Sequence, residues 1–328
     1  MNKGIVFSGM RPTGKLHLGH LSVLENWVKL QNEYRCYYGI VNWHALTTGF
    51  YNTSQLKENV REMALDWLSV GIDPDKSAVF IQSQVKEHAE LHLLLSMIIP
   101  LSWLERVPTY KDQLVQFGQA GKDISTYGFL GYPVLMGADI LVYGATAVPV
   151  GEDQLPHLEL TREIARRFNN LYKTNIMNEP QAILAKVKLL PGTDNRKMSK
   201  SYNNDISLNA STKEIQQKVA QMITDPNRIR KTDPGRPEVC TVYTYHTFYN
   251  NDEASEICTQ CTAGKIGCVA CKKNLSQKLD RFLAPIREKR AELVVKPGII
   301  EEILDYGAEK AREKASQTLQ LVREVMKI

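Results

Sequence analysis

Residues 5–20 have the sequence Ile-Val-Phe-Ser-Gly-Met-Arg-Pro-Thr-Gly-Lys-Leu-His-Leu-Gly-His. A short apolar run opens the segment and ends in the turn residues of Gly9–Gly14, which is typical of a strand followed by a turn. Apolar residues then recur at helical spacing over Leu16–Gln31. A strand that turns into a helix N-terminus directs backbone N–H groups and a partial positive charge toward a ligand. The segment therefore favours a phosphate-binding α/β fold.

Two histidines lie at the start of that helix. His17 and His20 are three residues apart, so we expect them to share one helical face. Gly19 lies between them and lacks a side chain, which leaves room for a flat base or ribose near the backbone. Two surface histidines at a helix start are the plainer alternative, but the Gly- and Pro-rich turn before them favours nucleotide binding.

A second basic motif, Arg196-Lys-Met-Ser-Lys-Ser201, follows the polar turn at residues 191–195. Its two lysines and two hydroxyls offer cations and donors to the charge that develops on a phosphate. A mobile loop could bring them into place only when the reaction proceeds. A solvated basic loop is the alternative, because that is the usual role of a charge run.

Strand and helix patterns alternate along the first half of the chain, which predicts a Rossmann-type parallel sheet. Helical patterns dominate after about residue 190. We therefore predict a catalytic domain over 1–185, joined by a C-terminal helix at about 299–328, and a mostly helical domain over 186–298. One predicted strand begins at residue 5, and the others cover 37–41, 79–82 and 147–150. The predicted helices cover 16–31, 53–70, 132–143, 154–169, 213–224, 275–295 and 299–326.

The composition is ordinary for a globular protein, with 328 residues and a formal net charge of +5. This mild surplus permits a phosphate-rich partner without requiring one. The N-terminus lacks the apolar core and cleavage site of a signal peptide, and no apolar stretch is long enough for a membrane span. We expect a cytoplasmic protein.

The two motifs together, with the strings at 132–140, 148–154 and 157–162, resemble class I aminoacyl-tRNA synthetases of the bacterial tryptophanyl type. Tyrosyl-tRNA synthetases share the fold and both motifs, but Gly151–Gln154 and the context of Asp139 favour tryptophan. A non-catalytic RNA- or metal-binding paralogue would not need an intact Lys197–Ser201 string. A small-molecule adenylyltransferase would not explain that string or the long helical half.

The resemblance implies that the chain uses ATP and Mg²⁺ to convert L-tryptophan to tryptophanyl-AMP, transfers it to tRNA(Trp), and forms a homodimer. The implied catalytic residues are His17, His20, Lys197 and Lys200. The implied ATP contacts are Arg11, Pro12, Thr13, Gly19, His20, Gly151, Glu152, Asp153, Lys197, Met198, Ser199, Lys200 and Ser201. The implied tryptophan pocket comprises Asp139, Tyr132, Met136, Gln154, His44 and Val150.

Asp139 is implied to accept the indole N–H. A buried carboxylate matched to one donor rejects a ligand that lacks this donor, because the carboxylate would be left unpaired, and phenylalanine would be excluded in this way. Met136 could also be plain helix core. Asn42 occupies a position where the family pattern leads us to expect an aspartate, so we give it no charged role.

Five cysteines lie between residues 240 and 271, and four of them form two C-x2-C pairs. Such pairs indicate a four-thiolate metal site, and by spacing alone Zn²⁺ is the default. A tryptophanyl-tRNA synthetase subgroup carries a 4Fe–4S cluster in this region, and its pattern implies Cys240, Cys261, Cys268 and Cys271 as ligands. The spacing leaves open whether Cys240 or Cys258 is the fourth ligand. We expect the site to support a tRNA anticodon-binding domain.

His88 and His92 are an i, i+4 pair on a predicted helix and could bind a metal. No third ligand is evident from the sequence, so we expect both to be surface or interface residues.

Overall fold

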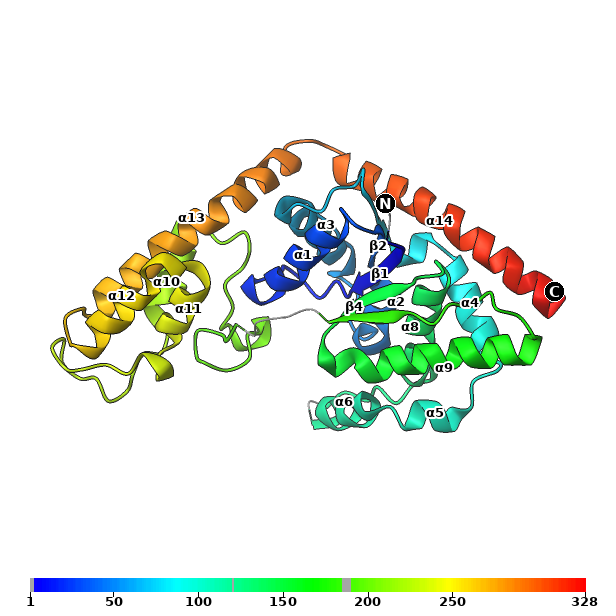
Figure 1. Cartoon of the computed structure of the whole chain (residues 1–328), viewed down its shortest axis with the longest axis horizontal. Helices are drawn as coiled ribbons and strands as arrows, with labels where there is room; N and C mark the ends of the chain where they lie inside the picture. Colours follow the sequence, from blue (N-terminus) through cyan, green and yellow to red (C-terminus); the bar gives the residue numbers. More distant parts are fainter. Residues whose placement is uncertain (1–2, 120, 185–189) are drawn as a thin grey trace. The chain divides into compact units, whose positions relative to one another are not determined.

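The structure is a computed structural model that describes residues 3–119, 121–184 and 190–328. Within these ranges five parallel strands form one sheet in the order β3-β2-β1-β4-β5 (Figure 1). This is the Rossmann strand order 3-2-1-4-5 without the sixth strand, so the predicted α/β fold is confirmed. The strands are β1 Ile5–Met10, β2 Arg35–Ile40, β3 Ser77–Ile81, β4 Ala147–Val150 and β5 Gln181–Leu184.

The register of the strands brings their carboxyl ends to one edge of the sheet. Met10 pairs with Ile40, which in turn pairs with Ile81, so the segments that follow β1, β2 and β3 start side by side. Ligands of open parallel sheets bind at this edge. The segments that leave β1, β2 and β4 carry Arg11–Thr13, His44 and Gly151–Gln154 of the implied sites.

The remaining regular elements are helices and short 3-10 turns, joined by loops. Gly71 ends α3 in the left-handed conformation at φ 117°, as expected for a glycine C-cap. The helices are α1 Leu18–Leu30, α2 Asn42–Gly49, α3 Leu56–Val70, α4 Glu87–Ser96, α5 Leu101–Glu105, α6 Pro108–Gln119, α7 Tyr127–Leu130, α8 Tyr132–Leu141, α9 Leu155–Tyr172, α10 Thr212–Gln221, α11 Thr241–Tyr249, α12 Asn251–Thr262, α13 Cys268–Val294 and α14 Ile299–Met326, and the 3-10 turns are η1 Gln82–Gln84, η2 Glu152–Gln154, η3 Lys200–Tyr202 and η4 Pro237–Val239.

The chain divides into two compact units. The sheet unit contains residues 1–14, 26–186 and 296–328, and the helical unit contains residues 15–25 and 187–295. The start of α1, with His17 and His20 beside it, thus groups with the helical unit. Within the described residues, none of the helices is long and apolar enough to cross a membrane.

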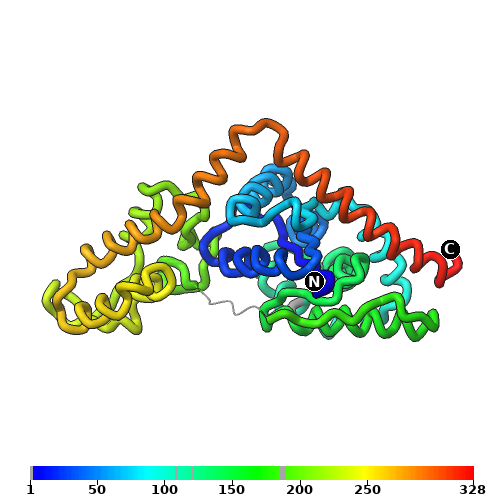
Figure 2. Tube along the Cα trace, turned by 45° about the horizontal axis from the view of Figure 1, so that its top comes forward, coloured from blue at the N-terminus to red at the C-terminus, as the bar shows by residue number. Residues whose placement is uncertain are grey.

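The last helix, α14, is part of the sheet unit and packs against β3 and α4. Figure 2 shows it as the red end of the chain. Its buried face consists largely of small residues, including Gly307, Ala308 and Ala311. A Cβ added to Gly307 would overlap the carbonyl oxygen of Val79 in β3, so the helix reaches the strand backbone only because this side chain is absent. Arg323 forms an ion pair with Glu90 of α4.

We predict that Gly307→Ala destabilises the sheet unit although alanine favours helices by about 1 kcal/mol. The overlap with Val79 forces a backbone shift, and such overpacking costs about 1–3 kcal/mol. The free energy of unfolding, measured in urea, should fall. Gly118→Ala in α6 is the matched control, because a Cβ there meets no atom within 4 Å. A Gly307→Ala protein as stable as the wild type would show that α14 does not rest on β3.

Candidate active site

The centre of the candidate tryptophan pocket is the carboxylate of Asp139, on α8 of the sheet unit. Its side chain is 1% exposed and is surrounded by donors from three other elements. Oδ1 lies 2.7 Å from His88 Nδ1 of α4, and Oδ2 lies 3.0 Å from His44 Nε2 of α2. Gln82 Nε2, in η1, donates to both oxygens at 2.8 Å. The structure therefore brings His44 and Asp139 together.

These partners keep Asp139 ionised. Burial alone raises the pKa of the carboxyl group, but electrostatic attraction and hydrogen bonds from His88 and His44 outweigh burial and hold the pKa of Asp139 below its usual value. The carboxylate is thus satisfied before any ligand arrives. This corrects the expectation that one ligand donor would be its match, because three protein donors already serve it.

His88 corrects the sequence analysis. It was expected at the surface or at an interface, but its side chain is fully buried, with Nδ1 on Asp139 and Nε2 2.6 Å from the Tyr143 hydroxyl. His92, one turn further along α4, is half-buried, and burial lowers its pKa. The i, i+4 spacing was visible in the sequence, but the carboxylate that His88 faces comes from a helix 51 residues away.

The other implied tryptophan contacts lie on α8, β4 and η2 of the same unit. The Tyr132 hydroxyl is 2.6 Å from His157 Nε2, Val150 is buried at the end of β4, and Met136 is half-buried on α8. Gln154 Nε2 donates to Asp153 Oδ2 at 2.8 Å. Met136 packs against the hydrophobic core and is partly exposed.

The implied ATP contacts of the sheet unit lie in two loops. Arg11 and Thr13 are exposed and Pro12 is buried after β1, where the Thr13 N–H donates to the Arg11 carbonyl at 2.9 Å. Gly151 follows β4, and a Cβ there would lie 2.7 Å from Asp153 Oδ1. Glu152 and Asp153 are exposed.

His17 and His20 lie together in the helical unit, but not as two residues on one helical face. The helix begins at Leu18, so His17 precedes it, and its ring lies 3.9 Å from the ring of His20. His17 Nδ1 accepts from the Gly19 N–H, and His20 Nδ1 accepts from the His17 N–H, both at 3.2 Å. In the neutral rings the proton is therefore on Nε2, which leaves two N–H donors.

Both histidines are neutral near pH 7. Burial, followed by the charge of Lys200, lowers the pKa of His17 to about 4. Burial, His17 and Lys200 lower the pKa of His20 to about 3. A side chain at position 19 would crowd the His17 ring, because a Cβ there would lie 3.0 Å from that ring and 3.5 Å from Met198 Sδ. The space that we expected for a base or ribose is bordered by these two side chains.

A buried asparagine fixes the Lys197–Ser201 segment. Asn204 Oδ1 accepts from the Ser199 N–H at 2.7 Å, and Asn204 Nδ2 donates to the Lys197 carbonyl at 3.1 Å and to Asp194 at 2.7 Å. Lys197 and Ser201 are exposed, Ser199 and Lys200 are half-buried, and Met198 is buried. The sequence analysis missed Asn204, although two successive asparagines one residue after the motif were a signal.

Four cysteines of the helical unit line one small cavity: Cys240, Cys261, Cys268 and Cys271. Arg228 Nη1 lies 3.6 Å from Cys261 Sγ and 3.9 Å from Cys268 Sγ. Burial raises the pKa of Cys271 to about 12. In the described part of the chain, no group of three or more His, Cys, Asp or Glu side chains has the geometry of a metal site. The thiols thus face one space without being drawn together.

Cys258 does not line that cavity, but interacts with Tyr243. This separates it from the four thiols that the sequence pattern implied.

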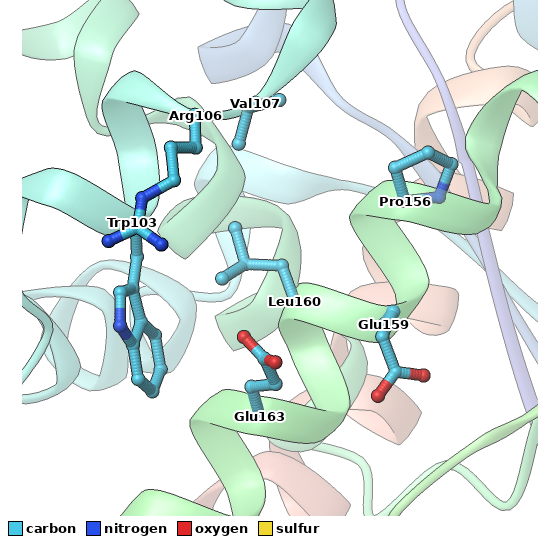
Figure 3. Close-up of a pocket in the computed structure, with 7 residues that line it drawn as sticks. All are labelled: Trp103, Arg106, Val107, Pro156, Glu159, Leu160 and Glu163. Atoms are coloured by element: carbon cyan, nitrogen blue, oxygen red, sulfur yellow. The ribbon is translucent and has the colours of Figure 1, made fainter.

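An open hollow elsewhere in the sheet unit lies between α5 and α9 (Figure 3). Trp103 and Arg106 face Leu160 and Glu163 across it. None of its lining residues belongs to the implied tryptophan or ATP contacts.

Comparison with known proteins agrees with this geometry. The family model described as tRNA synthetases class I (W and Y) matches residues 1–284. The tryptophan–tRNA ligase of Thermotoga maritima is 53% identical and that of Aquifex aeolicus 45%, each over 98% of this chain and 99% of the relative. The crystal structure of Campylobacter jejuni tryptophanyl-tRNA synthetase complexed with ADP and tryptophan is 34% identical, with a TM-score of 0.89 over 99% of this chain and 100% of that one. The chain therefore belongs to the class I tRNA synthetases for tryptophan and tyrosine, and among them to the bacterial-type tryptophanyl-tRNA synthetases.

Proposed function

We propose that Asp139 selects L-tryptophan in this tryptophan–tRNA ligase, and that His17, His20, Lys197 and Lys200 bind the phosphates of ATP. The reaction joins tryptophan to ATP as tryptophanyl-AMP and then transfers it to the 3′ end of tRNA(Trp). The observation that carries the proposal is an ionised carboxylate, buried at the carboxyl edge of the sheet and held by three donors.

Two ionised oxygens offer about four acceptor positions. His44 and His88 use one each, and Gln82 Nε2 lies 2.8 Å from both oxygens, so its contact is divided between them. The indole N–H takes an acceptor position that Gln82 holds only through this divided contact, while Val150 and Met136 contact the ring. Because Asp139 is already paired, a ligand without the N–H loses one charge-assisted hydrogen bond rather than leaving the charge bare. Phenylalanine is also smaller than tryptophan, so lost contact area adds to its rejection.

The phosphate-binding residues act by positioning and by charge. The tryptophan carboxylate attacks the α-phosphate and pyrophosphate leaves, so negative charge builds on oxygens that the protein must stabilise. His17 and His20 donate from Nε2 as neutral rings, and Lys197 and Lys200 supply the positive charge. Mg²⁺ accompanies ATP on its phosphate oxygens. Arg11–Thr13 and Gly151–Asp153 hold the nucleotide.

We predict that Lys200→Gln lowers tryptophan-dependent ATP–pyrophosphate exchange about 100-fold, because one cation facing the developing charge is lost. Tryptophan binding, measured by calorimetry without ATP, should not change. Lys213→Gln, an exposed lysine on α10, is the control and should exchange at the wild-type rate. Wild-type exchange by Lys200→Gln would contradict the assignment, and faster exchange with tyrosine than with tryptophan would contradict the substrate.

We also propose that Cys240, Cys261, Cys268 and Cys271 hold a 4Fe–4S cluster, with Zn²⁺ as the alternative occupant. Four thiols on one cavity suit either group, and a neighbouring guanidinium offsets the charge of an all-thiolate site. When bound, the group joins α11, α12 and α13 covalently and so braces the unit that binds the anticodon.

Anaerobically purified protein should be brown and contain iron and sulfide in equal amounts. Cys261→Ser should lose both and raise the KM for tRNA(Trp), while exchange without tRNA stays at the wild-type rate. Cys258→Ser is the matched control and should keep the cluster, because Cys258 lies off the cavity. Colourless protein with one zinc ion would establish the alternative, and metal-free protein would refute both.

We propose that the chain forms a homodimer through α4 and α5. Leu93, Met97 and Leu101 are each more than half exposed within nine residues of sequence, and clustered exposed apolar side chains mark protein interfaces. The Trp103 hollow of Figure 3 adjoins them on α5 and supplies a recess that a second copy can fill.

We predict that Met97→Glu shifts the protein toward monomers in sedimentation velocity, because a carboxylate would be buried without a partner. Leu321→Glu, at an exposed apolar position of α14, should leave the mass unchanged. If the wild type sediments as a monomer at micromolar concentration, the chain is not a stable dimer.

A further inference from the structure

We propose that Tyr143 and His88 form a hydrogen-bonded chain that orients the Asp139 carboxylate toward the indole N–H. His88 and Tyr143 are then positioning residues for substrate selection. The inference rests on the proposed role of Asp139, and it assigns a function to two residues outside the implied tryptophan contacts.

The hydrogen-bonded chain from Tyr143 through His88 to Asp139 is short, linear and shielded from water. The Tyr143 hydroxyl is 2.6 Å from His88 Nε2, and His88 Nδ1 is 2.7 Å from Asp139 Oδ1. Tyr143 and His88 are fully buried and Asp139 is 1% exposed. Each of these groups can therefore satisfy its hydrogen-bonding capacity only through protein neighbours.

The protonation states of Asp139 and Tyr143, at the two ends of the hydrogen-bonded chain, decide which atoms of His88 donate and accept. Asp139 is ionised and can only accept, so His88 must donate from Nδ1. Burial, followed by the charge of Asp139, raises the pKa of Tyr143 well above its usual value, so the phenol keeps its proton. Among the described residues His88 Nε2 is the one hydrogen-bond partner of that hydroxyl. A His88 ring protonated on Nε2 would leave the phenol proton buried and unpaired, which is costly. Tyr143 therefore donates to Nε2 and fixes His88 as the Nδ1–H tautomer.

Aromatic packing holds the chain in place. The Tyr143 ring stacks on Tyr37 at 4.4 Å and on Phe7 at 5.6 Å between centroids. Phe80 meets both Tyr143 and His88. These contacts fix the phenol, so its O–H points in one direction and the imidazole has one favourable orientation.

These hydrogen bonds set the direction in which the Asp139 carboxylate can accept a hydrogen bond from a ligand. His88 holds Oδ1 and His44 holds Oδ2, so the carboxylate plane is set by two rings from different helices. The direction in which the carboxylate can accept the indole N–H is then fixed. Without the Tyr143 hydroxyl the imidazole is held by a hydrogen bond at Nδ1 alone, so one of the three donors to the carboxylate is less firmly placed. Discrimination for the N–H should weaken more than general substrate binding.

The test compares tryptophan with 3-benzothienyl-alanine, in which sulfur replaces the indole N–H. The measured quantity is the ratio of kcat/KM for the two substrates in ATP–pyrophosphate exchange. Tyr143→Phe should lower this ratio about three- to tenfold, the value of one hydrogen bond. His88→Leu should lower it further, and His88→Asn, which keeps an N–H near the Nδ1 position, should restore part of it.

Tyr37→Phe is the matched control. Its ring packs in the same cluster, and its buried hydroxyl has no hydrogen-bond partner among the described residues, so the ratio should stay at the wild-type value. Equal losses of kcat/KM for both substrates in Tyr143→Phe would indicate a merely structural role and overturn the inference.

Asp139→Asn separates this inference from the proposed site. If Asp139→Asn lowers the ratio and Tyr143→Phe does not, the chain from Tyr143 fails and the role of Asp139 stands. If Asp139→Asn leaves the ratio unchanged, the proposed indole acceptor fails as well.

Discussion

A negative charge buried inside the sheet unit constrains the arrangement of the elements around it. An isolated carboxylate in an apolar core is too costly to remain ionised, so Asp139 requires donors at hydrogen-bonding distance. The donors come from α2, η1 and α4, elements that follow β2 and β3. A shift of any of these elements would remove a hydrogen-bond donor from the buried carboxylate. Arg323 of α14 also pairs with Glu90 of α4, the helix that carries His88.

The histidines that we propose for phosphate binding follow the opposite electrostatic rule. His17 and His20 are partly buried beside Lys200, so they lose their charge rather than gain a partner. Two neutral donors next to lysine cations can contact phosphate oxygens without adding repulsion to the free enzyme. The backbone of the turn sets both tautomers, since each Nδ1 accepts from an N–H. His17, His20 and Lys200 look like a basic cluster in the sequence, but the two histidines are neutral donors and only the lysine is a cation.

The sequence predicted the local patterns better than the contacts between them. Apolar periodicity predicted α3, α9 and α14 and the strands β1 to β4, because these elements bury one face or a continuous run. It missed β5, whose four residues follow a proline and are too few to show a period. His88 was misplaced for a different reason. Whether a helical histidine faces solvent or a buried carboxylate depends on the helix packed against it, and α8 lies some fifty residues away.

Sequence spacing alone does not show which cysteines line the cavity, because that also depends on their positions on the helices. Cys258 and Cys261 form one C-x2-C pair on α12, yet Cys261 alone of the two lines the cavity. Its partners lie at helix starts: Cys240 is the N-cap of α11, and Cys268 and Cys271 lie in the first turn of α13. Partial positive charge at a helix N-terminus stabilises thiolates. Burial outweighs this charge and raises the pKa of Cys240, Cys261 and Cys271, so a metal would have to displace their protons. The two N-terminal turns and the nearby guanidinium would lower that cost.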